Sequence, residues 1–232
     1  MDKGLFFLYI ARVSATSWKG DISIKLNKEV TLKKQKVAIF AAAIAGGGKG
    51  TTENGLKDKG IDYKTLPFRQ LFDREVEAKT EIGKMIQHYR GLGKLVPNDV
   101  VLPLVDEAFE MVGDTQLLFL DGFPRSIEQA DFALQRVRHF GYERIIVLHI
   151  DTPISTCLRR LKKRGRDVVD TDPEKVAQRV DEYAELTVPM VNYFRKNATK
   201  LGVEFYLVDG ENLLINMPAY IRMLDIEWMQ SK

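Results

Sequence analysis

The chain has 232 residues, of which 45% are hydrophobic and 29% charged, and its formal net charge at pH 7 is +3. This composition excludes an intrinsically disordered chain, and the small net charge gives no argument for nucleic-acid binding by bulk electrostatics. A single cysteine, Cys157, excludes an internal disulfide and a cysteine-rich zinc site. No apolar run reaches the roughly 18 residues of a membrane-spanning helix. We therefore expect a soluble cytoplasmic protein without a membrane partner.

Residues 1–35 differ in pattern from the rest of the chain. Their apolar run at 5–10 is short for a signal sequence, and no clear cleavage site follows it. A regular pattern begins at Lys36. The sequence therefore predicts an N-terminal extension of unknown role over residues 1–35 and a folded domain over residues 36–232.

From Lys36 onward, apolar runs of strand length alternate with helical patterns. The predicted strands are 37–42, a weaker one near 61–68, 117–120, 145–150 and 203–208, and the clearest helices are 102–112, 127–140 and 173–196. Such alternation is typical of parallel β-α units. It predicts a three-layer α/β/α sandwich with a central parallel sheet, in which ligands bind at the carboxyl ends of the strands.

A glycine-rich stretch, AGGGKGTT at residues 45–52, follows the first predicted strand. Glycines allow sharp turns and let backbone N–H groups approach an anion closely. Lys49 then supplies a cation for the outer phosphates, and Thr51, expected to open a helix, supplies a hydroxyl near magnesium. The layout is that of a phosphate-binding loop, although glycine-rich turns before helices also occur without that function.

A second motif, LLFLDGFPR at residues 117–125, ends another predicted strand. Asp121 is expected to point its carboxylate toward the glycine loop, where it could hold Mg²⁺ through water. Gly122 and Pro124 shape a turn, after which Arg125 presents a guanidinium suited to bidentate phosphate binding. The two motifs together predict a phosphate and magnesium site at one edge of the sheet.

The stretch DGFPRS at 121–126, followed by Gln129, resembles the signature of adenylate kinases and related nucleoside-monophosphate kinases. The resemblance extends from about residue 36 to 230 and includes GK at 83–84, GKLVPN at 93–98, Arg160, Arg164, RVDEY at 179–183, and VDG at 208–210. It implies a monomeric phosphate-binding-loop (P-loop) kinase with a small helical acceptor-binding arm at about 66–98 and a short lid at about 164–172.

The resemblance also implies roles for individual residues. The donor ATP, with Mg²⁺, would be held by Gly46, Gly47, Gly48, Lys49, Gly50, Thr51, Arg160 and Arg164. The acceptor AMP would be held by Lys94, Leu95, Val96, Gly122, Phe123, Pro124, Arg125, Gln129, Arg166 and Arg179. The catalytic set would be Lys49, Arg125, Arg160, Arg164 and Arg179. Arg166 is the candidate for a further lid arginine, although an ungapped alignment places Val168 there.

The chain departs from the family pattern mainly on the acceptor side. Ala43 and Ala45 replace a glycine and a proline of the glycine loop, and Asn98 stands where the family often has an acidic residue. In the acceptor arm, Phe68 and Arg69 take the places of a threonine and a glycine. The largest change is an aspartate, Asp73, in place of an arginine that binds the acceptor phosphate.

These departures leave three hypotheses open. The first is an adenylate kinase in which Arg69 or Arg74 compensates for Asp73. The second keeps the chemistry but changes the acceptor to UMP or CMP. The third is a non-catalytic nucleotide-binding protein built on the kinase fold.

Overall fold

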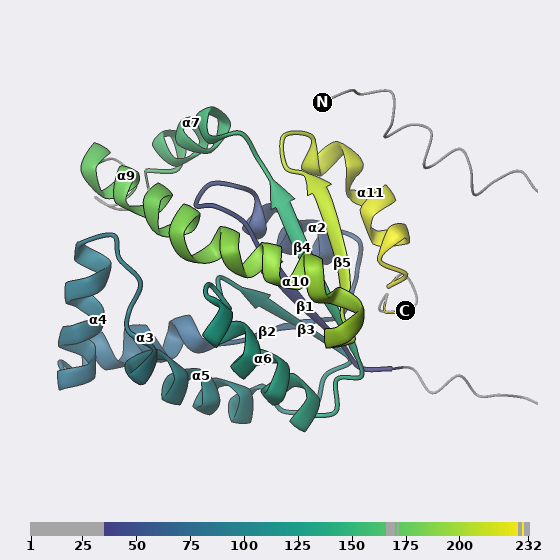
Figure 1. Cartoon of the computed structure of the whole chain (residues 1–232), viewed down its shortest axis with the longest axis horizontal. Coiled ribbons are helices and arrows are strands. Elements are labelled where there is room, and N and C mark those ends of the chain that lie inside the picture. Colours follow the sequence, from purple (N-terminus) through teal and green to yellow (C-terminus); the bar gives the residue numbers. More distant parts are fainter. Residues whose placement is uncertain (1–34, 166–169, 171, 227–228, 230–232) are drawn as a thin grey trace, which may run out of the picture. The chain divides into compact units, whose positions relative to one another are not determined.

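The computed structural model describes residues 35–165, 170, 172–226 and 229, so the predicted extension at 1–34 lies outside the described residues. Five strands form one parallel sheet in the order β2-β3-β1-β4-β5 (Figure 1). Their bounds are β1 Val37–Ala42, β2 Lys64–Thr65, β3 Leu117–Asp121, β4 Arg144–Asp151 and β5 Glu204–Asp209. The central parallel sheet predicted from the sequence is confirmed.

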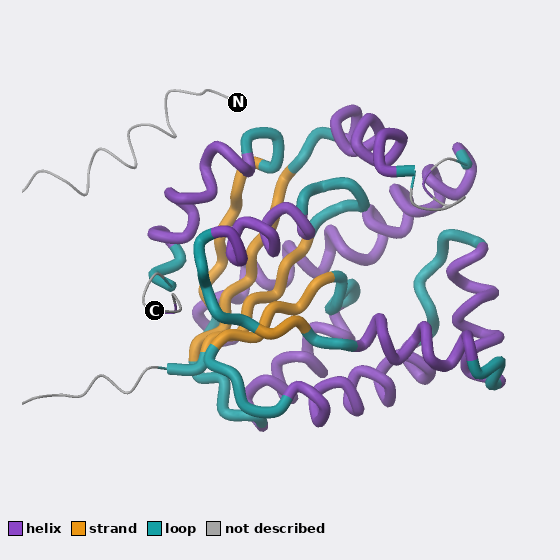
Figure 2. The backbone as a smooth tube through the Cα atoms, turned by 180° about the vertical axis from the view of Figure 1, so that it is seen from behind, coloured by secondary structure: helices purple, strands orange, loops and turns teal. Residues whose placement is uncertain are grey.

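Helices cover both faces of this sheet, because the central strands are apolar on both sides. In β1, Ala38 and Phe40 face a core formed with α5 (Asn98–Val112), α6 (Ile127–His139) and α10 (Val188–Leu201). The alternate residues Val37 and Ile39 face a second core formed with α2 (Lys49–Asp58) and α11 (Leu213–Met223). Figure 2 shows the sheet from the side of this second core. The three-layer arrangement is therefore the predicted one.

Two further groups of helices flank the carboxyl edge of the sheet. Helices α3 (Phe68–Glu77) and α4 (Glu81–Gly91) pack on each other beyond β2, and they occupy the predicted acceptor arm (Figure 1). Helix α7 (Ile154–Arg164) follows β4, and α9 (Pro173–Glu182) follows the predicted lid. Residues 166–169 and 171 of that lid lie outside the described part of the chain.

Several predicted boundaries need correction. Helix α2 begins at Lys49 and not at Thr51, because Gly48 adopts a left-handed conformation (φ 114°) that ends the loop there. The weak strand near 61–68 shrinks to Lys64–Thr65, since it pairs with β3 alone at the edge of the sheet. The helix expected over 173–196 is divided by a π-helical segment, Tyr183–Thr187, between α9 and α10. None of the described helices is long and apolar enough to cross a membrane.

Candidate active site

The glycine loop connects β1 to α2 and requires glycine at two positions. Gly46 has a φ of +78°, and a Cβ atom there would lie 2.7 Å from the Cys157 carbonyl oxygen. Gly48 has a φ of +114°, and a Cβ atom would lie 2.8 Å from the Leu213 side chain. Either substitution would combine a strained backbone with a steric clash. The loop can therefore bring its backbone close to α7 and α11 only with glycine at these positions.

The loop is fixed from both ends by hydrogen bonds. Thr152, just after β4, donates its hydroxyl to the Gly47 carbonyl oxygen at 2.8 Å. In the first turn of α2, the Thr52 hydroxyl donates to the Gly48 carbonyl oxygen at 3.3 Å. Thr51 lies in the same turn and is partly buried, while Gly50 is exposed. The N-terminal turn of α2 thus begins at the loop, where its free N–H groups favour an anion.

Lys49 lies at the start of α2 and donates its ammonium to the Ala43 carbonyl oxygen at 3.0 Å. The pKa of Lys49 is lowered to about 8, first by burial and then by nearby positive charges, whereas Asp121 acts in the opposite direction. The positive groups are Arg125, Arg179 and Arg69. At pH 7 the ammonium remains mostly protonated. It is therefore a desolvated cation among other positive charges, and a bound anion would stabilise it.

Asp121 ends β3 directly beside the start of the loop, because its register partner in β1 is Ala41. Its Oδ1 atom is buried and accepts no hydrogen bond from the described residues. A buried carboxylate oxygen in this condition is unusual and suits an electropositive partner such as a hydrated cation. The expected direction of Asp121, toward the glycine loop, agrees with its electrostatic effect on Lys49.

The turn after Asp121 holds Arg125 in a fixed orientation. The Arg125 guanidinium donates through Nε to the Gly122 carbonyl oxygen at 2.7 Å, and Gly122 has a φ of +78°. The Phe123–Pro124 peptide bond is cis. Burial lowers the pKa of Arg125 from its ordinary value, and the neighbouring Arg179 adds to this effect. Arg125 therefore resembles Lys49: it is a desolvated cation, and the positive charges that act on it outnumber the negative ones.

Gln129 is buried and links this turn to helix α5. Its Oε1 accepts the Arg125 backbone N–H at 2.8 Å, and its Nε2 donates to Asn98 Oδ1 at 2.8 Å. Asn98 in turn donates to Glu128 at 2.6 Å. The asparagine that departs from the family pattern is thus part of the hydrogen-bond network that orients Gln129.

The acceptor arm pairs its charges in a way that the sequence did not predict. Asp73 forms an ion pair with Arg90 at 2.7 Å. Arg74 donates to both carboxylate oxygens of Glu107, at 2.6 and 3.1 Å, and to Glu75 at 2.8 Å. Arg74 is therefore already paired with carboxylates. The charge of Arg69, in contrast, helps to lower the pKa of both Lys49 and Arg125.

The last part of the arm contacts helix α9. Leu95 donates its backbone N–H to Glu182 Oε2 at 3.2 Å, and a Cβ atom at Gly93 would lie 3.0 Å from the Lys175 carbonyl oxygen. Lys94 donates its backbone N–H to the Tyr89 carbonyl oxygen at 3.0 Å, and Val96 is buried. The segment 94–96 is thus held between α4 and α9.

The arginines of the lid side are positioned by acceptors from other elements. Arg160 in α7 donates to the carbonyl oxygen of Gly210, just after β5, at 2.9 Å. Arg164 makes two hydrogen bonds to Asp170, at 2.8 and 2.7 Å, and Arg179 reaches the same carboxylate at 2.9 Å. Asp170 therefore holds Arg164 and Arg179 side by side. Arg166, the candidate further lid arginine, lies outside the described residues.

Asp170, Arg90 and Glu182 were not predicted as site residues. Each is a charged residue in a segment rich in charge, and its significance comes from a partner that is distant in sequence or lies across a poorly patterned loop. Four acidic residues, Asp167, Asp170, Asp172 and Glu174, lie between the predicted phosphate-binding arginines at 164 and 179, so the sequence alone did not distinguish Asp170.

Asp170 gives a prediction for stability and pH. Its pKa is lowered to about 2, chiefly by hydrogen bonds from Arg164 and then from Arg179. Because the folded-state pKa lies below the ordinary value of 3.8, the stabilisation is present above about pH 4 and is lost as the pH falls toward 2. We expect Asp170→Asn to lower the free energy of unfolding by about 2 kcal/mol at pH 7, measured by urea denaturation.

The matched control for Asp170→Asn is Asp181→Asn, because Asp181 is exposed on α9. The urea concentration at the midpoint of unfolding should be the same for Asp181→Asn as for the parent. As the pH is lowered from 4 to 2, the difference between parent and Asp170→Asn should disappear. A constant difference over this range would show that the carboxylate charge of Asp170 is not the source of the stabilisation.

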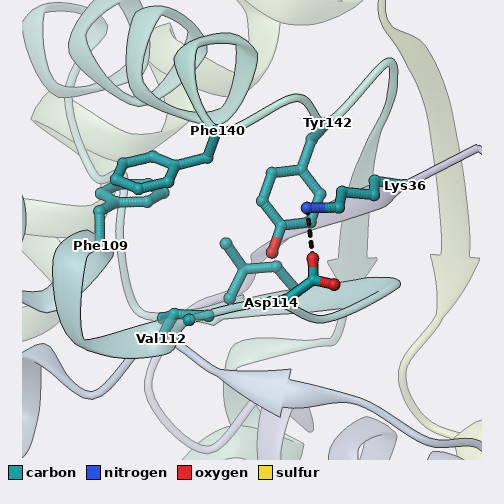
Figure 3. A pocket seen from close by; sticks show the side chains of 8 residues that line it. Lys36, Phe109, Val112, Asp114, Phe140 and Tyr142 are labelled. Atoms are coloured by element: carbon teal, nitrogen blue, oxygen red, sulfur yellow. Dashed lines mark ion pairs between the residues drawn. The ribbon is translucent and has the colours of Figure 1, made fainter.

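A hollow of about 200 Å³ lies at the opposite edge of the sheet, where the strands begin (Figure 3). Phe109 and Phe140 stack on one side of it, and Lys36 pairs with Asp114 at 2.6 Å on the other, with the Lys36 ammonium over the Tyr142 ring. This pocket is separate from the glycine loop, which follows the carboxyl end of β1.

The fold and the site together define a P-loop nucleotide phosphotransferase, with the glycine loop, Asp121 and the arginines at the carboxyl edge of a parallel sheet. The sequence model of the family "Adenylate kinase" matches residues 43–199. This chain belongs to the adenylate kinase family, and it is an adenylate kinase-like phosphotransferase that transfers phosphoryl groups from ATP to nucleoside monophosphates.

Curated bacterial relatives agree with this placement. An adenylate kinase of Porphyromonas gingivalis is 33% identical over 164 residues, which cover 69% of this chain and 83% of the relative. An adenylate kinase of Corynebacterium urealyticum is 30% identical over 159 residues, or 68% and 86% of the two chains. An adenylate kinase of Mycobacterium bovis is 33% identical over 150 residues, or 65% and 81%.

Proposed function

We propose that this chain catalyses the magnesium-dependent transfer of the γ-phosphoryl group from ATP to AMP, giving two ADP. The observation that carries the proposal is the convergence of cations on one edge of the sheet, where Arg125 and Arg179 help to lower the pKa of the buried Lys49 and Arg179 helps to lower that of the buried Arg125. Phosphoryl transfer depends mainly on positioning and on neutralising charge spread over phosphate oxygens. A cluster of mutually repelling cations supports binding of two polyanions at this place.

In this proposal the donor and the acceptor occupy opposite sides of Arg179. The donor triphosphate lies in the glycine loop against Lys49 and the N-terminal turn of α2, with Arg160 and Arg164 above it. The acceptor phosphate lies against Arg125, within a pocket made by residues 94–96 of the arm and by the 122–124 turn. Arg179 is held by Asp170 and lies near both Lys49 and Arg125. In this position it stabilises the charge of the phosphoryl group during transfer.

Mg²⁺ fits the residues present on the donor side. The buried Oδ1 of Asp121, which accepts no hydrogen bond from the described residues, would hold the ion through water, and the Thr51 hydroxyl would be a further ligand. When bound, Mg²⁺ neutralises phosphate charge. Among the described residues no group of three or more His, Cys, Asp or Glu surrounds a common point, so phosphate oxygens and water would complete the coordination.

The ion pair between Asp73 and Arg90 favours catalysis over the non-catalytic alternative. An isolated aspartate in the acceptor arm would repel a monophosphate, but a carboxylate paired at 2.7 Å has its charge largely compensated. The acceptor arm therefore does not present the unpaired negative charge that the sequence suggested. Phe68 and Arg69 still differ from the family pattern in this arm, so the preference for the acceptor base is determined by experiment.

The test is ADP formation from ATP with AMP, CMP, UMP and GMP, each measured with Mg²⁺ and with EDTA. We expect kcat/KM for AMP to exceed that for each other acceptor by at least about tenfold, because each tenfold needs only about 1.4 kcal/mol of selective base contacts. EDTA should abolish turnover with every acceptor. A preference for UMP or CMP would show the same phosphoryl transfer with a different acceptor. Turnover in EDTA would refute the magnesium requirement.

A further inference from the structure

The acceptor arm contains three arginines near the place where the family pattern has lost one, and their partners differ. Arg74 is bound to Glu107 and Glu75 on the exposed side of α3. Arg90 is paired with Asp73 and lies over the Phe72 ring at 5.2 Å. For Arg69, no acidic group lies within ion-pair distance among the described residues. Arg69 is thus the member of the three whose charge is not already compensated by a carboxylate.

The start of α3 is held against the turn that carries Arg125. The Phe68 ring lies 6.2 Å from Phe123, which is buried in that turn, and 5.6 Å from Phe72 on the next turn of α3. These contacts fix the first turn of the helix and so restrict where the next residue, Arg69, can reach. The Arg69 charge acts on both Lys49 and Arg125, which agrees with a position at the same edge of the sheet.

Arg90 approaches the same region from the neighbouring helix α4. Arg90 donates through Nη1 to Asp73 Oδ1 at 2.7 Å, and the face of its guanidinium lies over the Phe72 ring. A guanidinium held by a carboxylate and an aromatic ring has few orientations available, so it is pre-organised. Its charge also acts on Arg125.

Resting on the proposed function, we infer that Arg69 replaces the missing acceptor-side arginine as a direct ligand of the acceptor phosphate, beside Arg125. Asp73 acts as a positioning residue that orients Arg90 toward the same pocket. The aspartate is therefore part of a rebuilt phosphate site, and the acceptor is a nucleoside 5′-monophosphate whose dianionic phosphate is held by Arg69 and Arg125.

The first experiment compares Arg69→Ala with Arg74→Ala, two exposed arginines five residues apart on one helix. Arg69→Ala should raise the KM for AMP by about 10- to 100-fold, the loss expected for a charge-assisted hydrogen bond, while kcat and the KM for ATP change less than about threefold. Arg69→Lys should recover part of the loss. Arg74→Ala should leave the KM for AMP within about twofold of the parent. The inference is overturned if Arg69→Ala behaves as Arg74→Ala does.

A double-mutant cycle tests the role of Asp73. If Asp73 positions Arg90, Asp73→Asn should raise the KM for AMP in the parent and have no effect when Arg90 is already alanine. A lower KM for AMP in Asp73→Asn would show that the aspartate only repels the acceptor, and it would overturn this part of the inference.

Calorimetric titration of AMP into the same variants separates this inference from the proposed function. If no monophosphate is turned over but AMP binds in an Arg69-dependent manner, the proposed function fails and the rebuilt site stands. If turnover continues and Arg69→Ala leaves both KM and AMP affinity unchanged, the proposed function stands and the rebuilt site fails.

Discussion

The Lys49→Met variant is expected to lose phosphotransfer, with kcat/KM for ATP lower than that of the parent by about 10²- to 10³-fold. Methionine keeps the length and apolar stem of the side chain and removes only the ammonium. That ammonium is desolvated, bound to the Ala43 carbonyl oxygen, and still mostly protonated at pH 7 because its pKa is about 8. The measurement is steady-state ADP formation at saturating Mg²⁺.

The same variant should not be less stable than the parent. Burial disfavours the charge of Lys49, and Arg125, Arg179 and Arg69 repel it, while Asp121 attracts it; the net lowering of its pKa to about 8 means that the charge is unfavourable in the unliganded chain. Lys57→Ala, at the exposed end of the same helix, is the matched control and should keep parental kinetics. If Lys49→Met melts at or above the parent's Tm and yet retains activity within about twofold, Lys49 has no part in catalysis.

Replacing Arg125 by alanine is expected to lower kcat/KM for the acceptor by about 10²- to 10³-fold. The guanidinium is fixed by its hydrogen bond to the Gly122 carbonyl oxygen, and its backbone is fixed by Gln129, so it needs little reorganisation to meet a phosphate. ATP affinity should change by less than about threefold, because the donor side retains Lys49. Acceptor-dependent kinetics and ATP titration measure the two effects separately.

Two variants control for the loss of Arg125. Arg125→Lys keeps the charge but cannot make a bidentate contact, so its kcat/KM should lie between those of the parent and the alanine variant. Arg195→Ala, at an exposed position on α10, should leave both substrates unaffected. Equal losses of ATP and acceptor binding in Arg125→Ala would point to a damaged turn and not to a lost phosphate ligand.

The central fold could be predicted because its signals are local. Strand β1 is six consecutive buried apolar residues, which predicts a strand covered on both faces, and the glycine loop follows it directly. The turn from Asp121 to Arg125 is likewise a continuous motif at the end of a buried strand. In both cases the residues that determine the structure are neighbours in the sequence.

The charge pairing around the site could not be predicted for the opposite reason. Asp73 appeared to be an unpaired acidic residue, because its partner Arg90 is on a different helix and nothing in the pattern of α4 distinguishes that arginine. The sequence placed Arg164 and Arg179 in the catalytic set, but it gave no sign that Asp170 holds both arginines. Partners of this kind are selected by tertiary packing, on which periodicity and spacing give no information.

The most direct test is the formation of ADP from ATP and AMP by the full chain with Mg²⁺, using Lys49→Met as the blank. Turnover that depends on Lys49 is the predicted result, and it would show that the rebuilt acceptor arm supports catalysis. Binding of ATP to the parent without turnover of AMP, CMP, UMP or GMP would contradict the account and favour a nucleotide-binding role without phosphotransfer.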